Sequence, residues 1–241
     1  MLPAPAPWPP GLHAIRGVMS VPQLLVDADG AVLIDTGFPG DLARIRQVMT
    51  RAGVGPRDVR AILLTHGHID HAGNVAALQA WTGAPVHAHP LEQAHLDGEF
   101  PYTGLARVCG VLEAMARKVT GYRPARIDVP LADGDLLPFW GGLRVVHLPG
   151  HTLGHCGFYS VRHDLLFSGD LWVRFMMRTQ VSPRIFTSAP HLVLASLRQA
   201  RAIGARRMVP GHYDFPDALR LRRRFEELCE DVERRRAAKV V

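Results

Sequence analysis

The sequence predicts an α/β protein, a four-layer αβ/βα sandwich in which helices cover the outer faces of two sheets. Strand-like segments occur in two separate sets along the chain, and helix-like segments lie between and after them. A sheet and an amphipathic helix each have an apolar surface that must be buried against another element. We therefore expect helices to cover each set of strands. The chain has 241 residues, 47% of them apolar, which is enough to bury such a core.

The first set of strands begins with a hairpin. Apolar runs over 22–28 and 31–35 flank Asp29-Gly30, and an Asp-Gly pair between two such runs is typical of a tight β-turn. Beyond it, helical spacing of apolar side chains predicts helices, and short apolar runs predict strands. The expected elements are a helix over 41–52, a strand over 59–64, a helix over 72–81 and a strand over 85–88.

The second set of strands follows the segment 99–126, in which the pattern indicates one helix, over 105–119. The elements expected after it are strands over 136–139, 143–148, 156–161 and 164–167, a helix over 190–203 capped by Ser188, a strand over 207–209 and a helix over 218–236. The last helix has an apolar stripe made of Leu221, Phe225, Leu228 and Val232. Its other face mixes arginine with glutamate, which predicts a solvated face with ion pairs.

Residues 1–241 are expected to form a single domain that begins with a proline-rich arm over 1–12. The arm has no basic segment followed by an apolar run, so it does not resemble a secretion signal. No stretch reaches the ~18 apolar residues of a membrane-spanning helix. Cys109, Cys156 and Cys229 are odd in number and widely spaced, which favours a reducing compartment. We therefore expect a cytoplasmic protein with no membrane partner.

The net charge of +6 is a weak indicator of a nucleic-acid partner. Lys118 and Lys239 are the only lysines, and arginine supplies the rest of the positive charge. This excess of arginine, together with abundant alanine, proline and glycine, is typical of a GC-rich genome. We therefore expect no nucleic-acid partner, and the sequence carries no prediction of the oligomeric state.

A histidine-rich turn follows the strand expected over 59–64 and reads Thr65-His66-Gly67-His68-Ile69-Asp70-His71. In an extended segment, residues two apart point the same way, so His66 and His68 can face one metal ion. Asp70 and His71 lie where the chain turns into a helix, and their side chains can face a second position near that metal ion. The turn therefore predicts a metal site at the end of a buried strand.

Three later strands have the same layout, an apolar run that ends at a residue able to bind metal. They end at His151, Asp170 and His212, each close to a glycine. Together with the histidine-rich turn, they supply ligands for two metal ions, each with about three protein ligands and one bridge. Histidine and aspartate ligands suit zinc, manganese and iron.

The motifs occur in a fixed order along the chain. His-x-His-x-Asp-His at 66–71 is followed by Pro-Gly-His-Thr at 149–152, Ser-Gly-Asp at 168–170 and Pro-Gly-His at 210–212. Leu-Ile-Asp-Thr-Gly at 33–37 precedes them all. This ordered set strongly resembles the metallo-β-lactamase superfamily. The resemblance implies the four-layer sandwich and two divalent metal ions, zinc first, with manganese and iron as alternatives.

The resemblance also implies a role for each ligand. The implied ligands of the first metal are His66, His68 and His151. The implied ligands of the second metal are Asp70, His71 and His212. Asp170 would bridge both metals, and Asp35 would orient a ligand by hydrogen bonding.

Other candidate residues lie near these motifs. With seven ligands already assigned, we interpret the following histidines as structural or as partners of the ligands: His87, His147 and His155. His89 is a candidate substrate contact. Tyr213 directly follows a ligand, and is either a substrate contact or a packed side chain. Cys156 is expected to be a small core residue.

By the same resemblance, the predicted activity is hydrolysis of a small-molecule ester, lactone or thioester by a hydroxide that bridges two metals. Asp70 or Asp170 would carry the proton to the leaving atom. The chain has no Gly-x-Ser-x-Gly elbow that would indicate a serine nucleophile.

Departures from known branches of the superfamily narrow the activity. β-Lactamases of this fold generally lack the bridging aspartate that Asp170 supplies here, and glyoxalase II has a helical C-terminal domain that the short segment after His212 cannot form. Acyl-homoserine lactonases often have a tyrosine where this chain has Leu171, and segment 99–126 does not resemble the arm of tRNA-processing nucleases. Two other activities stay open: an iron-dependent persulfide dioxygenase, and a phosphodiesterase or nuclease.

Overall fold

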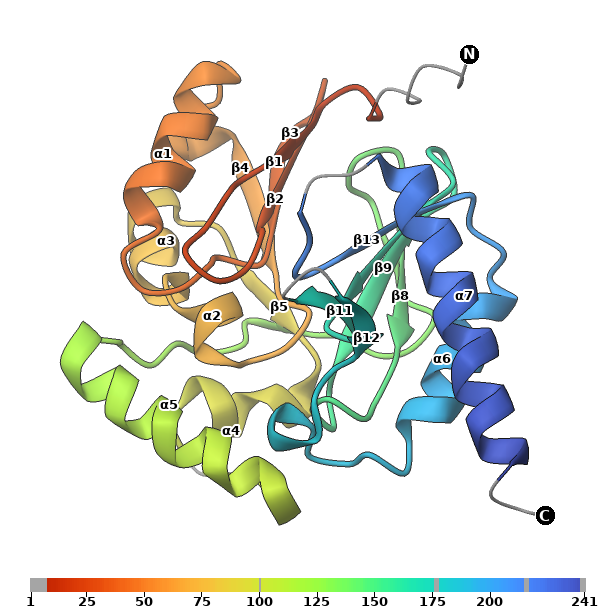
Figure 1. Cartoon of the computed structure of the whole chain (residues 1–241). Coiled ribbons are helices and arrows are strands. Elements are labelled where there is room, and N and C mark those ends of the chain that lie inside the picture. The colour runs from red at the N-terminus through yellow and green to blue at the C-terminus, as the bar shows by residue number, and fades with distance from the viewer. Residues whose placement is uncertain (1–7, 100, 176–177, 215–216, 239–241) are drawn as a thin grey trace.

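The computed structural model describes residues 8–99, 101–175, 178–214 and 217–238. Two large β-sheets pack against each other, and helices cover their outer faces (Figure 1). This confirms the predicted four-layer αβ/βα sandwich. Within the described ranges, no helix is long and apolar enough to cross a membrane.

The first sheet has six strands whose order in space follows their order in the chain. They are β1 (Leu12–Ala14), β2 (Gln23–Asp27), β3 (Gly30–Ile34), β4 (Val59–Leu63), β5 (Val86–Ala88) and β6 (Val129–Pro130). The first three strands pair antiparallel, and β3 to β6 pair parallel. The helices on its outer side are α1 (Leu42–Arg51), α2 (Ile69–Ala72) and α3 (Val75–Thr82) (Figure 1).

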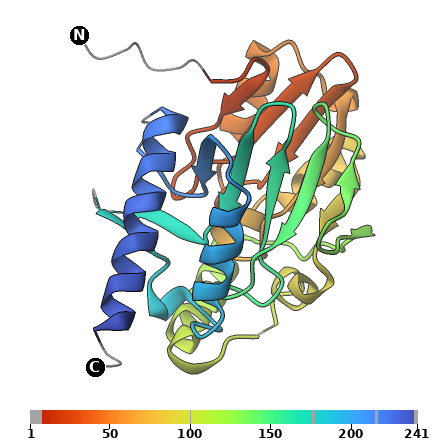
Figure 2. The same cartoon turned by 90° about the vertical axis from the view of Figure 1, so that its right-hand side faces the viewer.

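The second sheet has the order β13-β10-β9-β8-β7. Its strands are β7 (Leu136–Leu137), β8 (Leu143–His147), β9 (Cys156–Ser160), β10 (Leu165–Gly169) and β13 (Arg207–Pro210). Figure 2 shows α6 (Val193–Ala202) and α7 (Ala218–Ala237) lying over it. A separate two-stranded ribbon consists of β11 (Trp172–Phe175) and β12 (Arg178–Val181). The remaining helices, α4 (Gln93–Leu96) and α5 (Arg107–Thr120), lie at the bottom of Figure 1.

The β2–β3 hairpin shows why two sheets are needed to bury these strands. Leu25 pairs with Val32, and both belong to the core that includes the second sheet. Leu24 pairs with Leu33, and both pack instead in the core under α1 and α3. Successive side chains of a strand point to opposite faces, so a continuously apolar hairpin must be covered on both sides.

Most predicted elements are confirmed, but the helix expected over 72–81 is two helices. It begins earlier, as α2, and breaks at Gly73-Asn74 before α3. The side-chain amide of Asn74 donates hydrogen bonds to the backbone oxygens of Thr36 and Phe38. A Cβ on Gly73 would overlap Cδ of Pro39. The break therefore lets the chain pack closely against the segment that follows β3.

Two further expectations are wrong. Ser188 does not cap α6, because the helix begins at Val193 after Leu192, and the Ser188 amide donates instead to the His151 carbonyl. The proline-rich arm does not extend to residue 12, because Leu12 already pairs with Leu25 in the first sheet. The part of the arm over 1–7 lies outside the described residues. Strands β1, β6, β11 and β12 were not predicted, since each is short and weakly patterned.

Candidate metal centre

The structure brings all seven predicted ligands to one place. Each follows the carboxyl end of a strand: His66, His68, Asp70 and His71 follow β4, His151 follows β8, Asp170 follows β10 and His212 follows β13. Strands β10 and β13 are parallel and end together, with Gly169 opposite Pro210. Because parallel strands present their carboxyl ends at one edge, Asp170 and His212 become neighbours.

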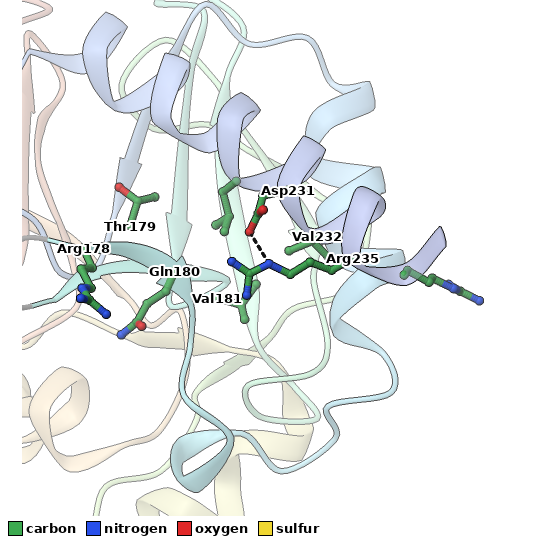
Figure 3. Close-up of a pocket in the computed structure, with 9 residues that line it drawn as sticks. Arg178, Thr179, Gln180, Val181, Asp231, Val232 and Arg235 are labelled. Carbon is green, nitrogen blue, oxygen red and sulfur yellow. Dashed lines mark ion pairs between the residues drawn. The ribbon is translucent and has the colours of Figure 1, made fainter. Parts of the chain in front are cut away.

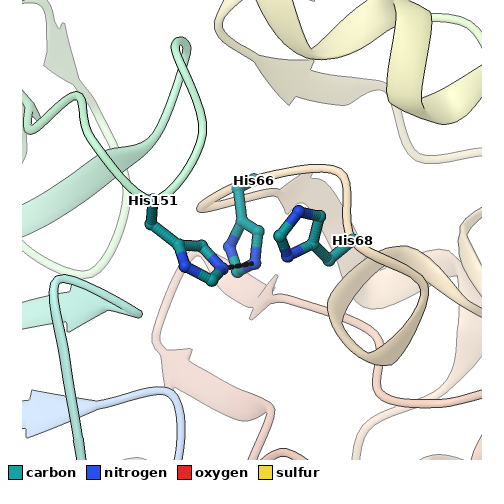
Figure 4. A group of neighbouring side chains, drawn as sticks. All are labelled: His66, His68 and His151. Carbon is teal, nitrogen blue, oxygen red and sulfur yellow. Dashed lines mark hydrogen bonds between the residues drawn. The ribbon is translucent and has the colours of Figure 1, made fainter. Parts of the chain in front are cut away.

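The first ligand group consists of His66, His68 and His151. One ring nitrogen of each lies within 4.8 Å of the others, and all three side chains are buried. Figure 4 shows the rings converging from the β4 turn and from the loop after β8. Nε2 of His66 lies 3.1 Å from Nε2 of His151. This is the trio that the family resemblance assigns to a first metal.

The second ligand group consists of Asp70, His71 and His212, whose ligand atoms also lie within 4.8 Å of one another. Nε2 of His71 lies 3.2 Å from Nε2 of His212. Nε2 of His212 lies 3.2 Å from Oδ2 of Asp70. The family resemblance assigns these residues to a second metal.

Asp170 lies between the two groups. Its Oδ2 is 3.1 Å from Nε2 of His212 and 3.7 Å from Nε2 of His151. Its Oδ1 is 3.4 Å from Nε2 of His71. The carboxylate therefore reaches histidines of both groups, which is the position expected of a bridging ligand.

Outer hydrogen bonds orient the histidine rings. Nδ1 of His71 donates to Oδ2 of Asp35 at 2.8 Å, and Nδ1 of His212 donates to the Met19 carbonyl at 2.8 Å. Thr65 Oγ1 lies 2.9 Å from Asp35 Oδ2 and 3.0 Å from Nδ1 of His66. Donation from Nδ1 leaves the Nε2 lone pair directed at the centre. Asp35 therefore has the orienting position predicted for it.

The electrostatics favour a cation at this place. Burial lowers the pKa values of His66 and His151 well below the usual range. Burial also lowers the pKa of His71, but nearby carboxylates, Asp170 foremost, outweigh it and raise that pKa to about 9. The pKa of Asp170 lies below its usual range, because His212 and His71 outweigh the effect of burial. The carboxylates therefore favour positive charge beside His71, and a metal ion bound there would take the place of the His71 proton, since imidazoles bind metal in the neutral form.

The donor set fits a metal ion. Two imidazole lone pairs that face each other at 3.1 Å repel unless a cation or a proton lies between them. Oδ1 of Asp170 is buried and accepts no hydrogen bond from any described residue. A divalent ion coordinated by histidine and aspartate would satisfy both requirements.

Glycine is required where the backbone approaches the ligands. A Cβ on Gly211 would overlap Oδ1 of Asp170 and lie 2.6 Å from Cε1 of His71. A Cβ on Gly67 would lie 2.5 Å from Cβ of His95, on α4. A side chain at either position would displace a ligand or the histidine-rich turn.

The other predicted candidates have structural roles. His155 is buried, accepts from the Asp170 amide through Nε2, and donates to the Leu148 carbonyl through Nδ1. His89 stacks on His147, accepts from the Leu91 amide and does not line the cavity at the ligands. The remaining three are packed side chains: His87 lies against Phe139, Tyr213 accepts from Gln23, and Cys156 is in the core.

Sequence reasoning missed Glu92, a buried carboxylate that joins the loops carrying the first ligand group. Oε2 accepts from the Gly67 amide at 2.7 Å. Oε1 accepts from the Thr152 hydroxyl at 2.7 Å and from the Gly154 amide at 2.8 Å. Burial raises the pKa of Glu92 to about 7, against these donors, which lower it. No local pattern could reveal this role, since the partners are distant in sequence.

Glu113, on α5, was also missed. Its Oε1 accepts from the Ile69 amide at 3.1 Å, and its Oε2 lies 3.2 Å from Arg117, which in turn donates to the Gly67 carbonyl. A glutamate four residues after Cys109, on the buried side of α5, is the one sequence feature that could have indicated it. Together Glu113 and Arg117 fix the histidine-rich turn to α5.

A cavity of about 410 Å³ opens directly onto the ligands. The ligand side chains that line it are His68, Asp70, His151, Asp170 and His212. A larger hollow, about 590 Å³, lies between β12 and α7 (Figure 3). Its lining includes Asp231, which pairs with Arg235. Among the described residues, the side-chain groups that could hold a metal all lie elsewhere. The chemistry therefore belongs to the smaller cavity.

The fold and the ligand cluster define a metal-binding αβ/βα sandwich protein. Residues 16–212 match the model of the metallo-beta-lactamase superfamily, and the chain belongs to that superfamily. The probable metallo-hydrolase YybB of Bacillus subtilis is 32% identical over 149 residues, which are 61% of this chain and 59% of that protein. A hydroxyacylglutathione hydrolase of Ectopseudomonas mendocina is 31% identical over 201 residues, 83% of this chain and 64% of the relative. The chain thus spans less than two thirds of either relative's length.

Solved structures agree with the fold. A metallo-beta-lactamase family protein from Thermus thermophilus superposes with a TM-score of 0.74 at 27% identity, over 95% of this chain and 81% of that one. A class B3 di-zinc metallo-beta-lactamase from an Alaskan soil metagenome superposes with a TM-score of 0.70 at 19% identity, over 93% and 89% of the two chains. At that lower identity the likeness concerns the fold alone.

Proposed function

We propose that this protein is a hydrolase that uses two divalent metal ions, zinc first, to cleave an ester, lactone or thioester bond in a small molecule. The observation that carries the proposal is the position of Asp170, within 3.7 Å of histidines from both ligand groups. The first group would hold one ion, the second group the other, and Asp170 would contact both. The relatives described as hydroxyacylglutathione hydrolases support thioesters as one substrate class.

The proposed reaction adds water across the acyl bond. Two divalent ions held by the two ligand groups and Asp170 would lower the pKa of a water molecule and polarise the attacked carbonyl. The water oxygen bonds to the acyl carbon, the bond from that carbon to oxygen or sulfur breaks, and the leaving atom takes a proton. Asp70 and Asp170 both line the cavity, so either carboxylate can carry that proton.

The cavity has no activated thiol that would favour a covalent route. Cys109 lines it, but burial raises the pKa of its thiol to about 12. A thiol with that pKa stays protonated at neutral pH and is a poor nucleophile. This supports direct attack by water.

Metal content is the first test. Protein purified and reloaded with zinc is expected to hold close to two ions per chain, measured by elemental analysis. His212→Ala should lose mainly one ion, because the ligand side chains beside His212 are His71 and Asp70 of the second group, together with Asp170. A single iron per chain, unchanged by His71→Ala and accompanied by oxygen consumption with a persulfide, would instead support the dioxygenase.

Salt dependence is the second test, since it separates small-molecule hydrolysis from cleavage of nucleic acid. Positive charge on α7 is paired with acidic residues, as in Arg235 with Asp231, and acidic residues of α7 also pair with Arg201 of α6. A nucleic-acid enzyme binds through phosphate contacts, and its affinity falls ~10³-fold or more between about 50 and 200 mM salt. We expect ester hydrolysis to change less than ~2-fold over that range. Tight DNA or RNA binding with metal-dependent strand cleavage, abolished by His66→Ala, would contradict the proposal.

A further inference from the structure

Away from the ligands, the walls of this cavity are mostly apolar. Its volume of about 410 Å³ falls within the ~300–1,000 Å³ of small-molecule sites. Besides the ligands, Glu113 and Ser182, its lining is apolar: Met19, Phe38, Ile69, Cys109, Leu112, Ala116, Val173, Pro183 and Phe186. Cavity walls of this kind favour apolar ligand surface.

No lysine or arginine lines this cavity among the residues that the structure describes. The chain carries a net charge of +6, so the absence is local. The one lining carboxylate outside the ligand set is Glu113, and its oxygens already accept from Ile69, Tyr102 and Arg117. A carboxylate or phosphate group on the distant part of a substrate would therefore enter the cavity without a cationic side chain to pair with, which is costly.

We propose that the substrate is an ester or thioester with an apolar acyl chain that carries no anionic group, and that this chain lies in the cavity beside α5 and the segment 182–186. This inference rests on the proposed function and narrows it. Leu112 and Ala116 line the cavity from α5, and Pro183 and Phe186 line it from the segment 182–186. Phe186 also packs against the small cluster that includes Cys109, so this segment and α5 belong to one packed unit.

Two side chains of α5 form a matched pair for a test. Leu112 lines the cavity and is 56% exposed, which places it at the mouth. Val119 lies seven residues further along the same helix, is 84% exposed and does not line the cavity. Leu112→Lys places a positive charge at the mouth of the cavity, whereas Val119→Lys places the same charge on the solvent-exposed surface of α5.

The experiment measures kcat/KM of the zinc-loaded enzyme for 4-nitrophenyl acetate, butanoate and hexanoate, and for the hexanoate analogue that ends in a carboxylate. We expect kcat/KM to rise ~3-fold for each CH₂ that enters the cavity. The terminal carboxylate should lower it at least ~10-fold relative to hexanoate. Leu112→Lys should lower the hexanoate-to-acetate ratio ~10-fold, and Val119→Lys should leave the ratio unchanged.

A binding measurement is independent of turnover. 1-Octanol should bind the wild type and Val119→Lys with a negative heat-capacity change in calorimetry, and should bind Leu112→Lys more weakly. Esters cleaved without chain-length preference, with no octanol binding, would overturn this inference and leave the proposed function standing. Octanol binding with no cleavage of any ester or thioester would overturn the proposed function and the substrate inference with it.

Discussion

Asp170→Asn is expected to weaken metal binding at both ligand groups and to lower kcat/KM at least ~100-fold, the upper end of the loss seen when only a partner of a ligand is removed. The aspartate carboxylate lies within 3.7 Å of Nε2 of His71, His151 and His212. Asparagine keeps the size of the side chain, but it removes the charge and turns an amide hydrogen toward nitrogens that carry lone pairs. One substitution therefore disturbs both halves of the centre.

The measurement combines zinc content by elemental analysis, zinc affinity by competition with a chelator, and ester hydrolysis. Asp231→Asn is the control. Asp231 belongs to α7 and lines the hollow between β12 and α7, so its substitution removes one negative charge away from the ligands. The control should match the wild type in all three measurements. Near-normal hydrolysis by Asp170→Asn with two zinc ions retained would show that Asp170 does not link the two groups.

The sequence predicts which side chains gather at the candidate centre, because each of them is local to a strand end. The turn 65–71 and the residues His151, Asp170 and His212 all follow apolar runs, and runs of that kind form buried strands in this fold. Once strands are parallel, their carboxyl ends meet at one edge, so ligands far apart in sequence become neighbours. A correct prediction of the strand ends therefore also predicts that these side chains lie close together.

The parts that sequence could not predict depend on contacts between distant segments. Glu92 and Glu113 are glutamates in short or amphipathic helical segments, where the usual expectation is exposure to solvent. Their burial follows from where α4 and α5 pack, which local periodicity does not contain. Likewise, the break between α2 and α3 follows from hydrogen bonds of Asn74 to the segment after β3. Tertiary contacts override helical pattern at each of these positions.

Glu92 connects the two loops of the first ligand group, and this connection predicts a large effect of its removal. The Gly67 amide lies between His66 and His68, and the Thr152 hydroxyl directly follows His151. Both groups donate to the Glu92 carboxylate, as does the Gly154 amide. The three side chains of the first ligand group are therefore held in position through a carboxylate that is not itself a candidate ligand.

Glu92→Ala is expected to destabilise the fold and to release metal from the first ligand group. It leaves three buried donors without an acceptor, at about 1–3 kcal/mol each, so the free energy of unfolding should fall by roughly 3 kcal/mol or more. A loss of that size lowers Tm by roughly 6–12 °C in a chain of this length. Calorimetry of the zinc-free protein checks the stability, and chelator competition should show zinc affinity ~10–100-fold weaker.

Two variants separate positioning from a general loss of stability. Glu99→Ala removes an exposed glutamate just beyond α4 and should change neither Tm nor zinc affinity. Glu92→Gln keeps the volume and one acceptor oxygen, so part of the network survives, and its zinc affinity should lie between those of the wild type and Glu92→Ala. Because the donors to Glu92 lie beside His66, His68 and His151, one of two zinc-binding steps should weaken while the ion held by His71 and His212 is retained. Equal weakening of both steps, or a fall in Tm with zinc affinity intact, would show that Glu92 supports the core without positioning the ligands.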